Sequence, residues 1–442
     1  MGLRMNSAIE PMKPALRRRM PDALARLVPA GWRRLVRDYM SAISGSLGRL
    51  VFSLAYFVIL ANTLTIADFG LFATASATGV VLSRIVAFGF SSPLYRAATM
   101  RPRLIGLYAG GYLAMAAASL PVLALAAGLA YAIVFSGEMA LATFALIIVT
   151  EALIWRSAEI VVIVNNGMGR FGRAAILVIC GTALRAAAAL GFWLVAAGDS
   201  VSAWAPWYAA ANLAVLAISL AWFFPRHRLR FHTGIVRRRL TDSLSVAGAE
   251  ILFYLQMELD KLLVLALGGP TLAGLYAIIM RLVDLTAIPM RTFNMMLVQA
   301  IMRRGGEIGG VLRRIGFETG IFAISTAGMA FIALMLAWRP DLIGRNVAEA
   351  APILLLALLI PGFRNLTEYH AELLYARGQS FRRAINLAVL AVLKAGLLTL
   401  LLAGGTGSQT SIIGSLTWAF GTLYLASMLL TYPALRQPAR PL

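Results

Sequence analysis

Charged side chains recur inside long apolar stretches of this sequence. Each of them would cost at least about 2.5–3.5 kcal/mol if it faced lipid, so it is expected to face a polar cavity or another charge. The planar fork of arginine suits such a cavity to a phosphate, because it can donate two hydrogen bonds at once. The candidates for binding an anionic ligand are Arg49, Arg84, Arg156, Lys261, Arg281, Arg291 and Arg364.

Acidic residues share these stretches, and a carboxylate at membrane depth is the usual site for a proton or Na⁺. The candidates for such ion coupling are Glu250, Glu258, Asp260 and Asp284. Spacing places several of them on a common helix face with a basic residue, since residues three, four or seven apart are neighbours on a helix. Arg281, Asp284 and Arg291 form one such stripe, and Glu258 with Lys261 belongs to another.

A structural alternative remains open for each of these charges. Arg281 with Asp284, or Lys261 with Glu258, could pair and only lock helices together. Arg49 and Arg291 lie near the ends of apolar stretches and could extend their head groups to water.

Several other chemistries find no support in the residues. The lysines are Lys13, Lys261 and Lys394, and none follows a glycine, which excludes a phosphate-binding loop for ATP. The single cysteine, Cys180, and three scattered histidines do not have metal-ligand spacing, so neither a metal nor another cofactor is expected. No nucleophile–base or paired-acid arrangement suggests an enzyme.

The composition indicates which elements must carry these charges. Hydrophobic residues make up 60% of the 442-residue chain and charged residues 13%, against about 25% charged in soluble domains. A helix needs roughly 20 apolar residues to cross a bilayer. The sequence therefore predicts an all-α polytopic membrane protein with about 12 transmembrane helices, at 43–65, 70–94, 105–134, 139–165, 172–197, 203–224, 241–267, 272–300, 315–338, 349–376, 383–403 and 411–432.

Arginines concentrate in alternate connections between these spans, which predicts that those connections and both termini are cytoplasmic. The net charge of +21 is thus a topology signal, and nucleic-acid binding is not expected. The predicted organisation is a basic cytoplasmic segment 1–40, a first lobe 41–225, a basic cytoplasmic linker 226–240, a second lobe 241–432 and a cytoplasmic tail 433–442.

The two halves resemble each other. Phe69-Gly70-Leu71-Phe72 opens the second span, and Ala273-Gly274-Leu275-Tyr276 opens the eighth. Each half has six spans, so the two have the same orientation, which predicts two six-helix lobes related by a parallel internal repeat. Two such lobes facing each other across a cavity are typical of a transporter.

The segments Glu258–Gly268 (ELDKLLVLALG) and Ala273–Arg281 (AGLYAIIMR), echoed by Ala67–Ala73 (ADFGLFA), carry a family resemblance. With the predicted topology, they make the chain after residue 40 similar to the polysaccharide transport family of O-antigen and exopolysaccharide flippases. This family belongs to the multidrug/oligosaccharidyl-lipid/polysaccharide exporter superfamily. Asp260 and Arg281 match its motif by position.

The resemblance implies a multi-pass protein of the bacterial cytoplasmic (inner) membrane whose first, second, seventh and eighth spans line a central cavity. It implies transfer of an undecaprenyl-diphosphate-linked oligosaccharide between leaflets, by ion- or potential-coupled alternating access. Partners would be the lipid-linked oligosaccharide and membrane lipid, and could include a polysaccharide polymerase and chain-length machinery. A multidrug/cation antiporter of the same superfamily, or a non-transporting scaffold of polysaccharide assembly, remains an alternative.

Overall fold

The computed structural model describes residues 48–195, 198–303, 310–340, 343–403 and 409–437. Within these ranges the chain forms helices joined by short connections, and none of these residues is in a strand. This confirms the prediction of an all-α fold. The predicted basic segment 1–40 lies outside the described residues, as does 438–442 of the predicted tail.

A first set of helices precedes α9, and we call it the first lobe. It consists of the helix Gly48–Thr63, α2 (Ile66–Leu82), η2 (Val86–Gly89), α3 (Ser91–Met100), η3 (Pro102–Leu104), α4 (Ile105–Ala130), η4 (Tyr131–Phe135), α5 (Leu141–Val149), η5 (Thr150–Trp155), α6 (Arg156–Gly167), α7 (Phe171–Val195), α8 (Val201–Ile218) and η6 (Ser219–Phe223). The helices after α9 form the second lobe: α10 (Val311–Trp338), α11 (Arg345–Leu354), α12 (Ile360–Ala376), α13 (Ser380–Ala403) and α14 (Gln409–Leu435).

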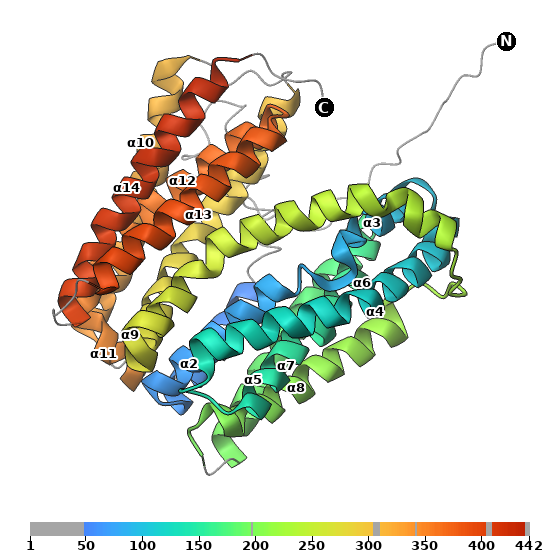
Figure 1. Cartoon of the computed structure of the whole chain (residues 1–442). Coiled ribbons are helices and arrows are strands. Elements are labelled where there is room, and N and C mark those ends of the chain that lie inside the picture. Colours follow the sequence, from blue (N-terminus) through green and yellow to red (C-terminus); the bar gives the residue numbers. More distant parts are fainter. Residues whose placement is uncertain (1–47, 196–197, 304–309, 341–342, 404–408, 438–442) are drawn as a thin grey trace, which may run out of the picture.

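The helix α9 (Thr233–Arg303) connects the lobes and packs against α2, α12 and α13. Its first part lies along the first lobe and its later part joins the second (Figure 1). It contains both the seventh and the eighth predicted spans. The chain turns back between them at Gly269, where φ is 78°. A positive φ of this kind favours glycine. Part of the predicted linker 226–240 is also helical, since α9 begins at Thr233.

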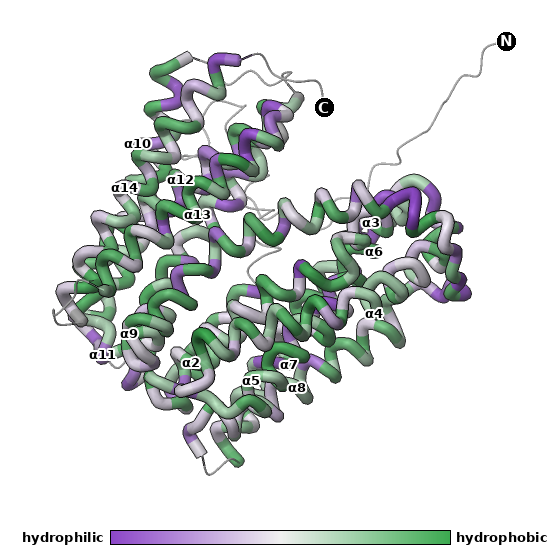
Figure 2. Tube along the Cα trace, in the orientation of Figure 1, coloured by the Kyte–Doolittle hydropathy of each residue, from purple (hydrophilic) through white to green (hydrophobic). Residues whose placement is uncertain are grey.

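Seven described helices are long and apolar enough to cross a membrane, and Gly48–Thr63 and Ile66–Leu82 are shorter apolar helices. Two further predicted spans are divided by local breaks. The second span breaks at η2, where Ala87 and Phe88 have positive φ, and the tenth is split between α11 and α12. Apolar residues cover the helices, while hydrophilic residues collect at helix ends and at a few interior positions (Figure 2).

One end of the seam between the lobes is tightly closed. The side chain of Asn346, at the start of α11, donates to the carbonyl oxygens of Ala61 and Leu64 at 2.6 and 2.8 Å. In the opposite direction, the side chain of Asn62 on the first helix donates to the carbonyl oxygen of Ile343 at 2.7 Å. These bonds satisfy the last carbonyls of the first helix, which would otherwise lack partners. We call this contact the asparagine clamp.

Candidate binding cavity

A cavity of about 810 Å³ lies at the opposite end of the seam. Its wall comes from both halves of α9 and from α12, α13 and α14, and among the lining residues Arg49 is the contribution of the first lobe. Met302 and Tyr375, near the ends of α9 and α12, place the mouth at the end of the bundle that carries the basic connections. The charged lining residues are Arg49, Glu258, Asp284, Arg291, Arg364, Glu368, Glu372 and Lys394.

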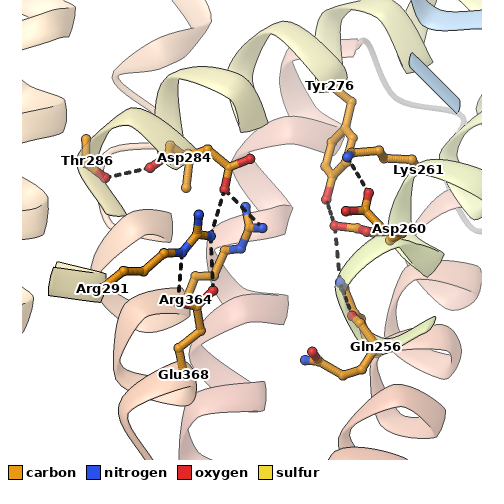
Figure 3. Close-up of polar contacts among 12 residues, drawn as sticks. Gln256, Asp260, Lys261, Tyr276, Asp284, Thr286, Arg291, Arg364 and Glu368 are labelled. Carbon is orange, nitrogen blue, oxygen red and sulfur yellow. Dashed lines mark hydrogen bonds and ion pairs between the residues drawn. The ribbon is translucent and has the colours of Figure 1, made fainter. Parts of the chain in front are cut away.

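One face of the cavity is a chain of alternating charges that links α9 to α12 (Figure 3). Asp284 lies 3.2 Å from Arg364 and 3.4 Å from Arg291, and Arg291 lies 3.3 Å from Glu368. The buried Nη1 of Arg364 has no hydrogen-bond partner among the described residues. An unpartnered buried donor is rare in proteins and often marks a functional position.

Lys394 on α13 forms the second charged contact of the wall. Its ammonium group lies 3.2 Å from Asp260 and donates to the carbonyl oxygen of Gln256 at 2.9 Å. Tyr276 donates at 2.5 Å to the same carboxylate oxygen of Asp260, Oδ2, that faces Lys394 (Figure 3). Asp260 is therefore buried and ion-paired, just behind the cavity surface.

The remaining acids of the wall are also paired. Glu258 lies 2.5 Å from Lys261, and Glu372 lies 2.8 Å from Arg383. Aromatic rings fill the space between these charges, and they belong to Phe253, Tyr254, Tyr375 and Phe420. The wall thus offers compensated charges, hydrogen-bonding groups and aromatic faces side by side.

Arg49 is the exception to this pairing. No carboxylate of the described chain lies within ion-pair distance of it, and its electrostatic neighbours are Arg185, Arg281 and Arg291. Arg281 likewise has no acidic partner in the described ranges, and donates instead to the carbonyl and hydroxyl oxygens of Ser53 on the first helix. Uncompensated positive charge therefore gathers where the first helix meets α9.

The other two predicted arginines lie elsewhere. Arg156 is 2.7 Å from Glu159 and 3.2 Å from Glu250, and Arg84 is 3.3 Å from Glu159. Arg84 also stacks on Tyr254, with 4.0 Å between its guanidinium carbon and the ring centre. This buried network joins α6 and the end of α2 to α9, and its arginines do not line the cavity.

The structure therefore divides the residues that the sequence singled out. Arg49, Glu258, Asp284, Arg291 and Arg364 line the cavity, while Lys261 and Asp260 pair with lining residues. Arg281 lies at the seam, and Arg84, Arg156 and Glu250 belong to the separate network. Of the spans expected to line the cavity, the first, seventh and eighth do so, whereas α2 contributes no described lining residue.

The residues predicted from the sequence to bind a ligand or an ion did not include three that line the cavity, Glu368, Glu372 and Lys394. Their charge inside apolar segments would have indicated them. The prediction also lacked the buried carboxylate of Glu151 and the partly buried one of Glu318. Glu151 accepts hydrogen bonds from Ser76 and Tyr208, both at 2.5 Å, and Glu318 contacts His370 in the second lobe. No group of three or more metal-binding side chains occurs in the described part of the chain.

Comparison with known proteins places the fold. No protein-family model and no curated protein matches the sequence. The structure is similar to an inward-facing multidrug resistance MATE family transporter of the MOP superfamily, with a TM-score of 0.62 and 13% identity over 88% of this chain and 94% of the other. It is also similar to a MATE in complex with MaL6, with a TM-score of 0.57 and 13% identity over 91% of this chain and 95% of the other.

A third similar structure is a MOP superfamily transporter from Pyrococcus furiosus, described as having a binding pocket of reversed polarity that suggests a different function. Its TM-score is 0.56, with 15% identity over 91% of this chain and 95% of the other. At such identities the likeness concerns the fold alone. The chain thus has the fold of a multi-pass MOP superfamily transporter, which agrees with the predicted fold class.

Proposed function

We propose that this protein is a transporter that flips a lipid-linked oligosaccharide, attached through a diphosphate, across the bacterial cytoplasmic membrane for surface polysaccharide synthesis. One observation carries the proposal. A polar cavity, open at one end of the seam and closed at the other, has Arg49 on its wall without a described acidic partner, and Arg281 lies at the adjoining seam against Ser53 of the first helix. Paired arginines are well suited to a diphosphate, since each can donate two hydrogen bonds.

The cavity wall suits a glycan. Its volume falls within the range of about 300–1,000 Å³ that is usual for small-ligand sites, so it can hold a head group of a few sugars while the lipid tail stays in the bilayer. Sugar hydroxyls need both donors and acceptors, which Asn294, Thr367 and the carboxylates of the wall supply. The aromatic rings offer flat apolar faces to sugar rings.

The direction of loading follows from the charge of the connections. Basic connections are retained in the cytoplasm, and the cavity opens at their end of the bundle, so the described state would accept its substrate from the cytoplasmic leaflet. Release on the other side then requires the asparagine clamp to open and the mouth to close, which is alternating access. In this proposal both termini are cytoplasmic.

The proposal is tested by complementation in a bacterium that lacks its own polysaccharide flippase, with the native strain as second host. Arg49→Ala and Arg281→Ala should abolish surface polysaccharide at matched expression, whereas Arg49→Lys should retain part of it. Arg103→Ala is the matched control, because Arg103 is an exposed basic residue at the same end of the bundle, away from the lining. Unchanged polysaccharide in both cavity-edge variants would reject the arginine-based mechanism.

A multidrug/cation antiporter is the second candidate, and a specific observation favours it. Four carboxylates line the cavity, from Glu258, Asp284, Glu368 and Glu372, and two of the similar structures are MATE transporters. Each of these acids is already held by a basic residue, which weakens their attraction for a cation. The discriminating measurement is drug susceptibility in an efflux-deficient host: resistance conferred without any polysaccharide rescue would favour the antiporter.

A further inference from the structure

A second polar cluster lies inside the second lobe, where α10, α12 and α14 meet. The fully buried ring of His370 has its Nδ1 3.0 Å from the hydroxyl of Ser427 and its Nε2 3.0 Å from the carboxylate of Glu318. Glu318 also accepts hydrogen bonds from Tyr432 and, at 3.2 Å, from Tyr424. The imidazole stacks on Tyr424 at 5.7 Å between ring centres.

The cluster can gain one proton without moving a heavy atom. With a neutral imidazole, Nε2–H donates to Glu318 and Nδ1 accepts from the Ser427 hydroxyl. With an imidazolium, Nδ1–H donates to Ser427, whose hydroxyl has rotated, and every other contact stays as it was. The added proton also converts the lone carboxylate charge into an ion pair, and an unpaired buried charge is costly.

This pairing distinguishes Glu318 from the acids predicted to couple to an ion. Each of those acids lies beside a lysine or an arginine, and they are Glu250, Glu258, Asp260 and Asp284. The partner of Glu318 is instead histidine, the side chain that changes charge most readily near neutral pH. Glu151 also lacks a basic partner, but its hydrogen-bond donors are a serine and a tyrosine.

The other ionisable groups around His370 can be assigned by helix. On α10, Arg314 precedes Glu318 by about one helical turn and lies outside ion-pair distance of it. Both groups interact electrostatically with Tyr369 of α12. On α14 the ionisable groups are Tyr424 and Tyr432. On α9 and α13, Arg291 and Arg383 are ionisable, and they pair with Glu368 and Glu372 at the cavity side of α12.

The route for the proton and its effect follow from the same helices. The side chain of Glu318 is 12% exposed, and Glu318 lies about 10 Å from the beginning of α10 at Val311, at 1.5 Å per residue. That beginning is at the end of the bundle that bears the basic connections. The helix α12 presents Arg364 and Glu368 to the cavity and His370 to the lobe interior. A change at His370 therefore acts on the helix that forms the cavity wall.

We propose that His370 and Glu318 form a proton-binding site inside the second lobe, loaded from the end with the basic connections, whose occupancy strengthens the contact between α10 and α12 and so favours the open arrangement of the cavity. The link to transport rests on the proposed function, whereas proton binding does not. The two can therefore fail separately.

Proton binding is tested by NMR of the full chain labelled with ¹⁵N-histidine in lipid nanodiscs. The other histidines, His227 and His232, are exposed and can be replaced by glutamine to leave a single signal. Spectra are recorded from about pH 8 down to about pH 5, and proton binding predicts that the His370 resonances change reversibly from the neutral to the imidazolium pattern. A single protonation pattern throughout this range would overturn the proposal.

The effect on the cavity is tested by spin labels at Arg103→Cys and Ser380→Cys, on opposite sides of the mouth, in a Cys180→Ser background. Without any substrate, the ratio of open to closed distances should change at least about five-fold between the same pH limits. The change should be lost in His370→Gln and in Glu318→Gln, which preserve hydrogen-bonding shape, and kept in His232→Gln. A pH response that survives in both cluster variants would overturn the link to α12.

Discussion

Gly70 on α2 and Gly274 on α9 meet backbone to backbone across the closed end of the seam. A Cβ atom on Gly70 would lie 2.4 Å from the amide nitrogen of Gly274, and one on Gly274 would lie 1.9 Å from the carbonyl oxygen of Ile66. Both glycines belong to the repeated motif of the two halves. The repeat therefore supplies matched bare surfaces that let α2 and α9 close the seam on the side away from the cavity.

We predict that Gly274→Ala opens this end of the seam. The added methyl group would overlap the backbone of Ile66 on α2, so the two helices must separate. This should destabilise the closed state by about 1–3 kcal/mol. The measurement is labelling by a membrane-impermeant thiol reagent of Ala61→Cys, a residue buried at the asparagine clamp, in a Cys180→Ser background. Labelling should become faster in Gly274→Ala. Gly320→Ala is the control, since a Cβ there meets open space.

The asparagine clamp leads to a second prediction. Asn346→Asp keeps the shape of the side chain but removes both hydrogens that it donates to Ala61 and Leu64. The two buried carbonyls then lose a partner, which costs about 1–3 kcal/mol each, so the closed end should open as it does in Gly274→Ala. The same thiol-labelling assay applies. Equal labelling rates in Asn346→Asp and the parent protein would show that the clamp does not hold the seam.

A third prediction separates structural arginines from those at the cavity. Arg156→Ala leaves Glu159 and Glu250 without their closest basic partner, although Arg84 still lies 3.3 Å from Glu159. Because both carboxylates are partly exposed, the expected cost is below the roughly 3–5 kcal/mol of a broken, fully buried pair. Its thermal unfolding temperature should fall by a few degrees, at most about 2–4 °C for each kcal/mol lost, because this ratio decreases with chain length. Arg49→Ala should leave the unfolding temperature unchanged, because Arg49 has no such partner. A fall of equal size in both variants would contradict this division.

The fourth prediction concerns Asp284, which holds Arg364 and Arg291 together. Asp284→Asn should destabilise the protein more than the double variant Asp284→Asn with Arg364→Met, since the second change removes the charge that the first leaves unpaired. Chemical or thermal unfolding of the two single variants and the double variant gives the coupling. Simple additivity would mean that the pair is not linked energetically in the folded protein.

Most of the helices could be predicted from the sequence, because a bilayer-length apolar stretch is a strong local signal. The break at Ala87 could not, since alanine does not favour the positive φ that it adopts there. The break between α11 and α12 does have a local signal, because Pro352 and Pro361 flank it. The same division between local and distant signals applies to the charges. Sequence spacing identified Lys261 with Glu258, which lie on one helix turn, and the structure forms that pair.

Pairs between distant segments were beyond such reasoning. The sequence predicts Arg84 and Arg156 as candidates for binding an anionic ligand, but Glu250, on the helix that connects the lobes, pairs with both of them. In the same way, nothing in the spacing of Glu318 and His370 indicates that they touch. Arg49 could be singled out as charged, yet its lack of an acidic partner is visible only when every neighbouring helix is in place.

The contact of Glu250 with Arg156 has a consequence for the speed of any cycle. The helix α9 is tied by this ion pair to the first lobe and by Asp260 and Asp284 to the second. If the lobes rotate apart, either the tie at Glu250 breaks or α9 bends between its two anchors. Both options cost free energy, so exchange between two arrangements of the lobes would be slower in this protein than in a variant that lacks Glu250.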